Sequence, residues 1–325
     1  MKRREFIGLL GGVAAWPLAA RAQQAIPVIG FMSARAPETD MHLIAAFREG
    51  LREQGFVEGK NFAIEFRWAR GDYERLPALA AELVALRVAV LAAVGGDSSA
   101  AAAKQATSTI PVVFGVGGDP TKSGLVDSFS HPGGNLTGYT LLTSQMETKR
   151  VGLLHELVPG VGVFGALVNP NFERTSRQLE QIEEATRKLG LQVYFANARD
   201  DVELDEACAS LVRHRVGAFM VSADPYFDTR RDKIVTFAAQ ARLPAIYQFR
   251  EFALAGGLIS YGPNITEMYK HGGAYAGRIL RGAKPADLPV VQPTKFLLVI
   301  NQKTATTLNL AIPNSMQLLA DEVIE

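Results

Sequence analysis

Cysteine is almost absent from this sequence of 325 residues, which contains only Cys208. A single thiol can form neither an internal disulfide nor a metal site built from several cysteines. The five histidines show no metal-ligand spacing; they are His42, His131, His155, His214 and His271. We therefore expect no bound metal, and we expect Cys208 to be a buried helix residue.

An excess of charge of either sign is also absent. The 34 Lys and Arg residues almost balance the 33 Asp and Glu residues, and the body of the chain contains no basic run. Nucleic acids and anionic membranes attract proteins through clustered positive charge. We therefore expect no nucleic-acid partner. With 48% hydrophobic residues, the chain has the composition of a globular protein long enough for two domains.

Known catalytic motifs are missing as well. The sequence contains no Gly-x-Ser-x-Gly, no His-Glu-x-x-His and no Walker-type phosphate loop. The glycines at 115, 117 and 118 lack the full dinucleotide-binding spacing and do not open the first βα unit. We therefore predict a protein that is not an enzyme and that holds no cofactor.

The start of the chain has the pattern of an export signal. Three basic residues at 2–4 precede an apolar run from Ile7 to Ala20, and small residues occupy positions 20 and 22. The run is shorter than the roughly 20 residues of a transmembrane helix. The segment Arg3-Arg4-Glu5-Phe6-Ile7 is typical of twin-arginine signals. We predict that residues 1–22 form such a signal, cleaved after Ala22, and that the mature protein is periplasmic; the alternative is a buried N-terminal helix.

From Ile26 onward, short apolar runs alternate with amphipathic segments. This alternation is typical of βαβ units with a mainly parallel sheet. Strands are predicted at 28–32, 62–68, 88–94 and 110–116. Leu43, Phe47 and Leu51 recur at helical spacing, so we expect a helix with these side chains on its buried face and Gly55 at its end. The order predicts a doubly wound α/β fold.

The second half of the chain repeats the first. Residues 51–66 match 186–195, 82–97 match 210–224, 102–114 match 236–247, and 133–139 match 256–262. We therefore expect two doubly wound, Rossmann-like lobes with a ligand cleft between them. The alternative interpretation is that any two segments of such a fold look alike.

Polar loops follow the predicted strands, and ligands of open parallel sheets bind at that edge. The candidate binding residues in these loops and at nearby strand ends are Ser33, Ala34, Gly96, Asp97, Ser98, Ser99, Gly118, Asp119, Asn169, Asn171, Asp224, Tyr226, Gln248 and Tyr261. Ser98 and Ser99 begin a predicted helix whose free amides favour an anion, so we expect them to bind a carboxylate.

We expect Asp224 to bind an amine, and Tyr226 with Tyr261 to flank the solute's side group. Each residue has a structural alternative. Asp97, Ser98, Asp119 and Asp224 also occupy positions typical of helix N-caps. Tyr261 follows a strand, and closing the core is the commoner role of a single aromatic residue in that position.

Several blocks together resemble one known family. They are the signal ending in Ala-Arg-Ala-Gln-Gln, residues 117–120 (Gly-Gly-Asp-Pro), 131–138 (His-Pro-Gly-Gly-Asn-Leu-Thr-Gly), 256–262 and 284–290. The chain resembles the ABC transporter substrate-binding proteins of the tryptophan-binding-protein-like branch. The resemblance implies a type I periplasmic-binding-protein fold with three interlobe crossings, placed near Leu141, Gly262 and Pro289. Lobe one would comprise 26–141 plus 262–289, and lobe two 142–261 plus 290–325.

Members of that family bind amino-acid-like or aromatic solutes, so the resemblance implies the same solute class here. We therefore expect the mature chain to be a monomeric, periplasmic component of an ABC importer, which closes on a small solute by hinge motion and delivers it to a membrane permease. Two alternatives remain open at this point: a twin-arginine-exported enzyme with a cofactor, and the ligand-sensing domain of a signalling system.

Overall fold

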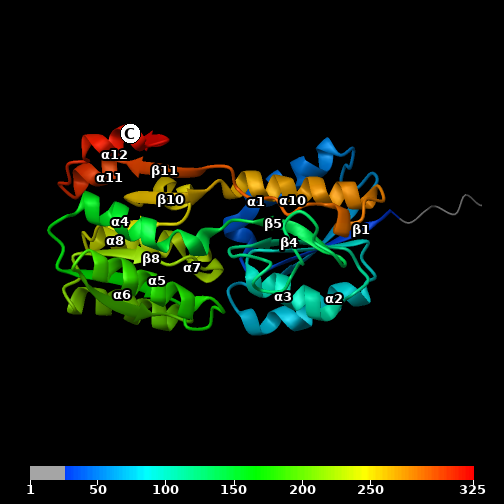
Figure 1. Cartoon of the computed structure of the whole chain (residues 1–325), viewed down its shortest axis with the longest axis horizontal. Coiled ribbons are helices and arrows are strands. Elements are labelled where there is room, and N and C mark those ends of the chain that lie inside the picture. The colour runs from blue at the N-terminus through cyan, green and yellow to red at the C-terminus, as the bar shows by residue number, and fades with distance from the viewer. Residues whose placement is uncertain (1–25) are drawn as a thin grey trace, which may run out of the picture.

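The computed structural model describes residues 26–325, which form two lobes placed side by side, each built on its own sheet (Figure 1). The predicted two-lobed α/β fold is confirmed. The signal predicted at residues 1–22 lies outside the described residues. Within the described part of the chain, no helix combines the length and apolarity needed to span a membrane.

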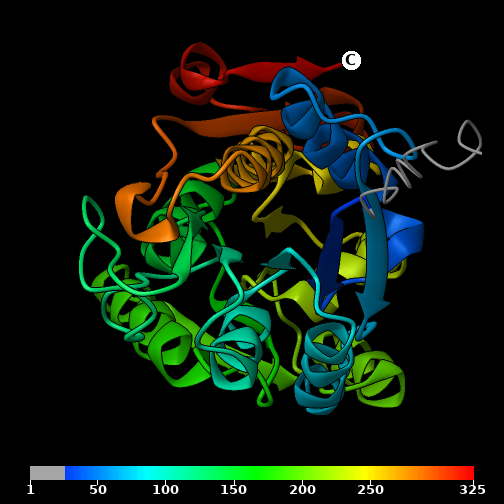
Figure 2. The ribbon, with the colours of Figure 1, turned by 90° about the vertical axis from the view of Figure 1, so that its right-hand side faces the viewer.

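Lobe one contains a five-stranded parallel sheet of order β2-β1-β3-β4-β5. Its strands are β1 (Val28–Ser33), β2 (Ala63–Trp68), β3 (Val90–Val94), β4 (Val112–Val116) and β5 (Leu136–Thr140). Helices α2 (Leu76–Ala85) and α3 (Asp97–Ala106) cover one face, and α1 (Pro37–Glu53) and α10 (Ile265–Leu280) cover the other (Figure 2). Helix α10 thus returns to lobe one from late in the sequence.

The predicted helix face is confirmed in α1. Leu43, Phe47 and Leu51 are fully buried, and Gly55 follows the helix with φ of +82°. A residue in this left-handed region ends a helix, and glycine adopts it without steric cost. The predicted strand 88–94 begins two residues later, at Val90, because Arg87 occupies the left-handed region with φ of 53° and redirects the chain first.

Lobe two contains a seven-stranded sheet of order β12-β11-β10-β9-β8-β6-β7. Its strands are β6 (Val163–Val168), β7 (Gln192–Asn197), β8 (Ala218–Val221), β9 (Ala245–Tyr247), β10 (Ile259–Pro263), β11 (Phe296–Asn301) and β12 (Glu322–Ile324). Only β11 pairs antiparallel, against β10. The helices are α4 (Glu147–Leu157), α5 (Thr175–Lys188), α6 (Asp201–Arg213), α7 (Pro225–Thr229), α8 (Arg231–Gln240), α9 (Arg250–Leu254), α11 (Gln302–Thr307) and α12 (Asn314–Leu319).

The internal repeat is confirmed by the strand order. Strands β6 to β10 are arranged as β7-β6-β8-β9-β10, which reproduces the order β2-β1-β3-β4-β5 of lobe one. The matched blocks lie on equivalent elements; 82–97, for example, covers α2 and β3, and 210–224 covers α6 and β8. Arg87 and Arg215 even share the same left-handed turn, with φ of 53° and 51°. Cys208 is a buried residue of α6, as predicted.

Three segments of chain run between the sheets. The chain enters lobe two after β5 and returns to lobe one after β10. It enters lobe two a second time between Val291 and β11; Val291 still belongs to lobe one, where it pairs with Tyr139. A fully buried ion pair joins the first of these segments to the end of lobe two's sheet: Arg150 lies 2.8 Å from Glu147 and donates to the backbone carbonyls of Thr143 in that segment (2.9 Å) and of Tyr261 in β10 (3.1 Å). The segment and β10 are therefore both fixed to α4.

Helices α1 and α10 approach each other through glycine. A Cβ atom on Gly273 would lie 1.9 Å from the carbonyl oxygen of Phe47, and one on Gly50 would lie 2.0 Å from that of Lys270. The two backbones are thus in direct contact, which leaves no room for a methyl group at either position.

We expect Gly273→Ala to lower the free energy of unfolding by about 1–3 kcal/mol, because the added methyl forces the two helices apart. Gly152→Ala in α4 is the matched control, since a Cβ there meets nothing within 4 Å. The control should raise stability by up to about 1 kcal/mol through helix propensity. Urea unfolding of both variants measures this, and equal stability of the two would contradict the packing argument.

Candidate functional site

A cavity lies between the two lobes, with about 420 Å³ of empty space when its part open to solvent is included. It is bordered by the loops after β1, β3, β4, β6, β8 and β9, the segment that follows β5, and helix α10, which is the strand edge where ligands of parallel sheets bind. The lining residues are Arg35, Gly95, Gly96, Asp97, Gly115, Gly117, Tyr139, Leu141, Thr143, Phe172, Ala223, Asp224, Pro225, Asp228, Gln248, Phe249, Ile265 and Tyr269. Both lobes contribute walls, so the cavity depends on their relative position.

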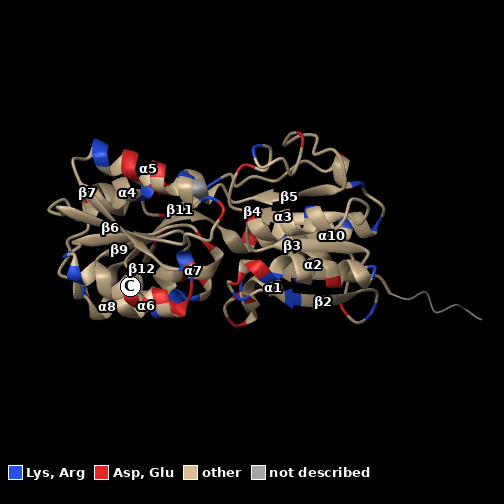
Figure 3. Cartoon of the chain, turned by 90° about the horizontal axis from the view of Figure 1, so that it is seen from below, with Lys and Arg blue, Asp and Glu red and all other residues tan. Residues whose placement is uncertain are grey.

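Polar contacts join the lobes across this cavity. Tyr73 of lobe one donates a hydrogen bond of 2.7 Å to Asp224 of lobe two. Asp97 of lobe one pairs with Arg174 of lobe two. Residues of both charge signs lie where the lobes face each other (Figure 3). The structure therefore shows the lobes in a closed arrangement.

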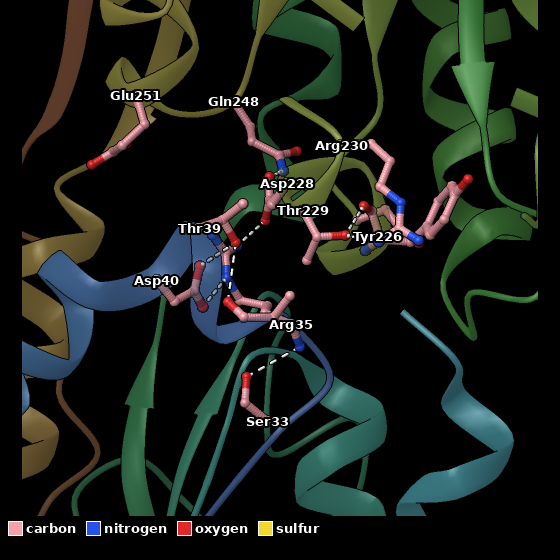
Figure 4. A network of polar contacts seen from close by, with 12 residues as sticks. Ser33, Arg35, Thr39, Asp40, Tyr226, Asp228, Thr229, Arg230, Gln248 and Glu251 are labelled. Carbon is pink, nitrogen blue, oxygen red and sulfur yellow. Dashed lines mark hydrogen bonds and ion pairs between the residues drawn. The ribbon is translucent and has the colours of Figure 1, made fainter. Parts of the chain in front are cut away.

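Arg35 lies at the centre of a buried polar network, seen from close by in Figure 4. Its Nε lies 2.7 Å from Asp40, and its Nη1 pairs with Asp228 across the lobe boundary. The side-chain amide of Gln248 donates to the same Asp228 carboxylate. Burial acts to lower the pKa of Arg35, but Asp40 and Asp228 outweigh it and hold this pKa well above its ordinary value. Arg35 is therefore a charged group with its partners already in place.

Asp224 is a buried carboxylate whose two oxygens have different surroundings. Oδ1 accepts from the Tyr73 hydroxyl and, at 2.6 Å, from the Tyr226 amide, so Asp224 caps α7. Oδ2 has no hydrogen bond; the Asn169 amide faces the carboxylate and lowers its pKa, but no hydrogen bond of normal length joins them. Burial raises the pKa of Asp224 to about 7, and the nearby Asp228 contributes. Burial also raises the pKa of Asp228, to about 6.

The carboxylate of Asp97, the first residue of α3, contacts the loop after β4 and lobe two. Asp97 accepts from the amide of Gly117 at 2.9 Å and pairs with Arg174. Ser99 is buried, and its hydroxyl accepts from the Ala34 amide at 3.1 Å. Neither Ser98 nor Ser99 lines the cavity. Their predicted role as a carboxylate site stays a prediction, and their positions do not support it.

Four of the predicted residues come together in the cavity wall, namely Gly96, Asp97, Asp224 and Gln248. Ser33 and Ala34 lie buried beneath the β3 loop, and Asn169 lies behind Asp224. Gly118 packs against the guanidinium of Arg174, and Asp119 accepts from its neighbour Thr121, so both are outside the cavity.

The predicted aromatic pair is separated. Tyr226 and Asn171 line an outer groove, where Arg230 lies 4.8 Å above the Tyr226 ring. Tyr261 stacks on Phe296, with ring centroids 6.0 Å apart, and does not line the cavity. The aromatic walls are instead Tyr139, Phe172, Phe249 and Tyr269.

Six residues that line the cavity were not predicted from the sequence. They are these four aromatic residues, Arg35 and Asp228. Tyr139 lies in one of the repeated blocks, which is the one signal that singled it out. Tyr269 lies on α10, which reaches the cavity only because that helix packs back on lobe one. Asp228 follows Asp224 by one helical turn, a spacing that places both carboxylates on the same side of a helix.

The raised pKa of Asp224 predicts a pH-dependent stability. A carboxyl group whose folded-state pKa exceeds its unfolded-state value destabilises the fold as pH rises from about 4 to 7. Asp224→Asn keeps the acceptor for Tyr73 and removes the charge. Relative to wild type, this variant should gain about 2–3 kcal/mol of unfolding free energy between pH 5 and pH 8.

Asp321→Asn is the control, because the ion pair with Lys295 holds the pKa of Asp321 below its ordinary value. That carboxylate is ionised at both pH values in both states, so its difference from wild type should stay constant. Chemical unfolding at pH 5, 6, 7 and 8 provides the comparison. A constant difference for Asp224→Asn as well would show that Asp224 does not titrate abnormally.

The architecture and sequence match known proteins over most of the chain. A family model described as "ABC transporter substrate binding protein" matches residues 27–324. The chain is 25% identical over 264 residues to a tyrosine-binding protein of Clostridioides difficile (strain R20291), covering 81% of this chain and 75% of the relative.

Two solved structures share the two-lobed fold. An ABC domain in complex with L-Trp from Streptococcus pneumonia has a TM-score of 0.81 at 25% identity, covering 92% of this chain and all of the other. A conserved domain protein from Vibrio cholerae has a TM-score of 0.82 at 25% identity, covering 92% and 99% of the two chains. Because the family model covers nearly every described residue, the chain belongs to the ABC transporter substrate-binding protein family.

Proposed function

We propose that this chain is the periplasmic solute-binding component of an ABC importer, and that it encloses an amino-acid-like or aromatic solute between its lobes. The observation that carries the proposal is the interlobe cavity, where the acceptors Asp224 Oδ2 and Gln248 Oε1 are buried without a hydrogen bond. Buried polar atoms normally have partners. A solute ammonium group that donates to both oxygens supplies them.

The remaining walls suit an aromatic body. Tyr139, Phe172, Phe249 and Tyr269 face the cavity from both lobes, and Phe172 and Phe249 carry no polar atom in their rings. Rings of this kind pack against aromatic groups in offset or edge-to-face geometry. The relatives named for tyrosine binding and crystallised with L-Trp support the same solute class.

Closure follows from the placement of Asp224. Its Oδ1 accepts from Tyr73 of the opposite lobe, whereas Oδ2 has no hydrogen bond. Solute binding to lobe two therefore fixes the carboxylate that lobe one must contact. Such a solute binds the closed form more tightly and shifts the population toward it. The closed form is then the one that the permease recognises.

Export by the twin-arginine signal, with cleavage after Ala22, brings the protein to the periplasm. The mature protein acts there as a monomer.

The solute class is tested on the chain beginning at Gln23, which contains every described residue. We expect selective thermal stabilisation by members of one class from a panel of amino acids, aromatic amines, aromatic acids, nucleobases and sugars. A ligand at about 100 times its Kd adds roughly 2.7 kcal/mol. The ligand should be recovered unchanged. A purified protein that binds no panel member but carries a metal or chromophore would favour an exported enzyme instead.

Tyr73→Phe tests the link between binding and closure. Removing the hydroxyl deletes a hydrogen bond to a buried carboxylate, so we expect at least about a tenfold weaker Kd for the tightest panel solute. Titration calorimetry measures Kd, and small-angle scattering measures the solute-induced decrease in radius of gyration. Tyr194→Phe is the control. Tyr194 lies in β7, away from the cavity, and its ring stacks on His214. Identical binding and compaction in both variants would refute the coupling.

A further inference from the structure

Three glycines of lobe one lie where lobe two touches it. Gly71 follows β2, Gly96 follows β3 and Gly118 follows β4, so all three lie at the carboxyl edge of the sheet. A Cβ atom on Gly71 would lie 2.7 Å from the ring of Tyr226, and one on Gly96 would lie 2.7 Å from the ring of Pro225. Non-bonded carbon atoms pack about 3.5–4.0 Å apart. The closed arrangement of the lobes therefore leaves no room for a side chain at either position.

The contact at Gly118 involves a charged group of lobe two. A Cβ atom on Gly118 would overlap the guanidinium of Arg174, to which its three nearest atoms all belong. The φ of Gly118 is not positive, so the local backbone does not require glycine there. The requirement comes from Arg174 of the opposite lobe.

Polar contacts between the lobes accompany two of these close approaches. Arg174 pairs with Asp97 of lobe one. Arg230 lies 4.8 Å from the ring of Tyr226, and it donates a hydrogen bond of 3.4 Å to the carbonyl of Arg70, the residue before Gly71 (Figure 4). The polar groups draw the lobes together, and the missing side chains of the glycines determine how closely they approach.

We propose that Gly71, Gly96 and Gly118 are positioning residues for closure, which together form a closure stop. Lobe two comes to rest there with its side chains directly against the backbone of lobe one. The size of the closed cavity is then set by contact between the lobes, and a solute must fit that size to be enclosed. The proposal goes beyond the proposed function, because it concerns how the lobes meet and applies to any solute.

Disulfide cross-linking tests the closure stop without a solute. A Cβ atom on Gly96 would lie 3.9 Å from that of Pro225, and one on Gly71 would lie 3.5 Å from that of Tyr226. Disulfides join Cβ atoms about 3.5–4.5 Å apart. We expect Gly96→Cys/Pro225→Cys and Gly71→Cys/Tyr226→Cys, each combined with Cys208→Ser, to lose both thiols on mild oxidation as a monomer. Thiol titration and peptide mapping by mass spectrometry measure this.

Gly124→Cys/Pro225→Cys, also combined with Cys208→Ser, is the matched control. Gly124 has a positive φ of 67°, as Gly71 and Gly96 have positive φ, but a Cβ atom there meets nothing within 4 Å. The control should keep both thiols. If the two test pairs also keep their thiols, with the panel solutes present as well as without them, the lobes do not meet at these glycines and the inference fails.

Gly118→Ala measures how the closure stop affects binding. The methyl displaces Arg174 from Asp97 when the lobes close, so we expect about a fivefold weaker Kd for the tightest panel solute in titration calorimetry. In an Arg174→Ala background the same methyl should leave Kd unchanged, a rescue that a damaged fold would not show. Gly160→Ala, whose Cβ meets nothing within 4 Å, should bind as wild type does.

The outcomes distinguish this inference from the proposed function. Equal weakening by Gly118→Ala with and without Arg174, or no weakening in either background, would overturn the role of Gly118. If no panel solute binds, the proposed function fails, and the cross-linking experiment still decides whether the lobes meet at Gly71 and Gly96.

Discussion

The buried ion pair between Glu147 and Arg150 is the interaction on which the geometry of the cleft depends. Both side chains are fully excluded from solvent, so their desolvation is offset only by close pairing and additional hydrogen bonds. Arg150 supplies these bonds to Thr143, in the first segment between the lobes, and to Tyr261, in strand β10 just before the second. Glu147 accepts from the amide of Ala223 at 3.3 Å. One pair thus holds the hinge and the residue that precedes Asp224.

This constraint helps to position the polar residues in the cavity wall of lobe two. Ala223 is fixed by Glu147, Asp224 caps α7, and Asp228 lies one turn further along that helix. The two carboxylates therefore reach the cavity from a short rigid element, not from a free loop. Arg35 of lobe one pairs with Asp228 as well as Asp40, whereas Asp224 accepts from a neutral hydroxyl and forms no ion pair. The electrostatic character of the cavity follows from that asymmetry.

The fold could be predicted from the sequence because its signals are local. The spacing of Leu43, Phe47 and Leu51 specifies a helix face within one element, and the repeated blocks specify two equivalent lobes. The site was only partly predictable, because its walls come from contacts that no local pattern records. Asp224 was identified from its position after a strand, whereas Tyr269 reaches the cavity only through the packing of α10 on α1. Tyr226 has the same local position as a ligand residue, but its ring lies on the outer side of the closed cleft.

The difference between Asp97 and Asp224 shows how two loops of similar sequence acquire different roles. Both aspartates follow equivalent strands of the repeat, β3 and β8, and both lie at the start of a helix. Asp97 is satisfied by Arg174 and the Gly117 amide, so its charge is used within the protein to join the lobes. Asp224 instead accepts a hydrogen bond from the neutral hydroxyl of Tyr73 in the other lobe, and its second oxygen has no hydrogen bond. Because a buried charge needs a counter-charge, the ammonium group of the proposed solute would balance the Asp224 carboxylate at the position where the lobes meet.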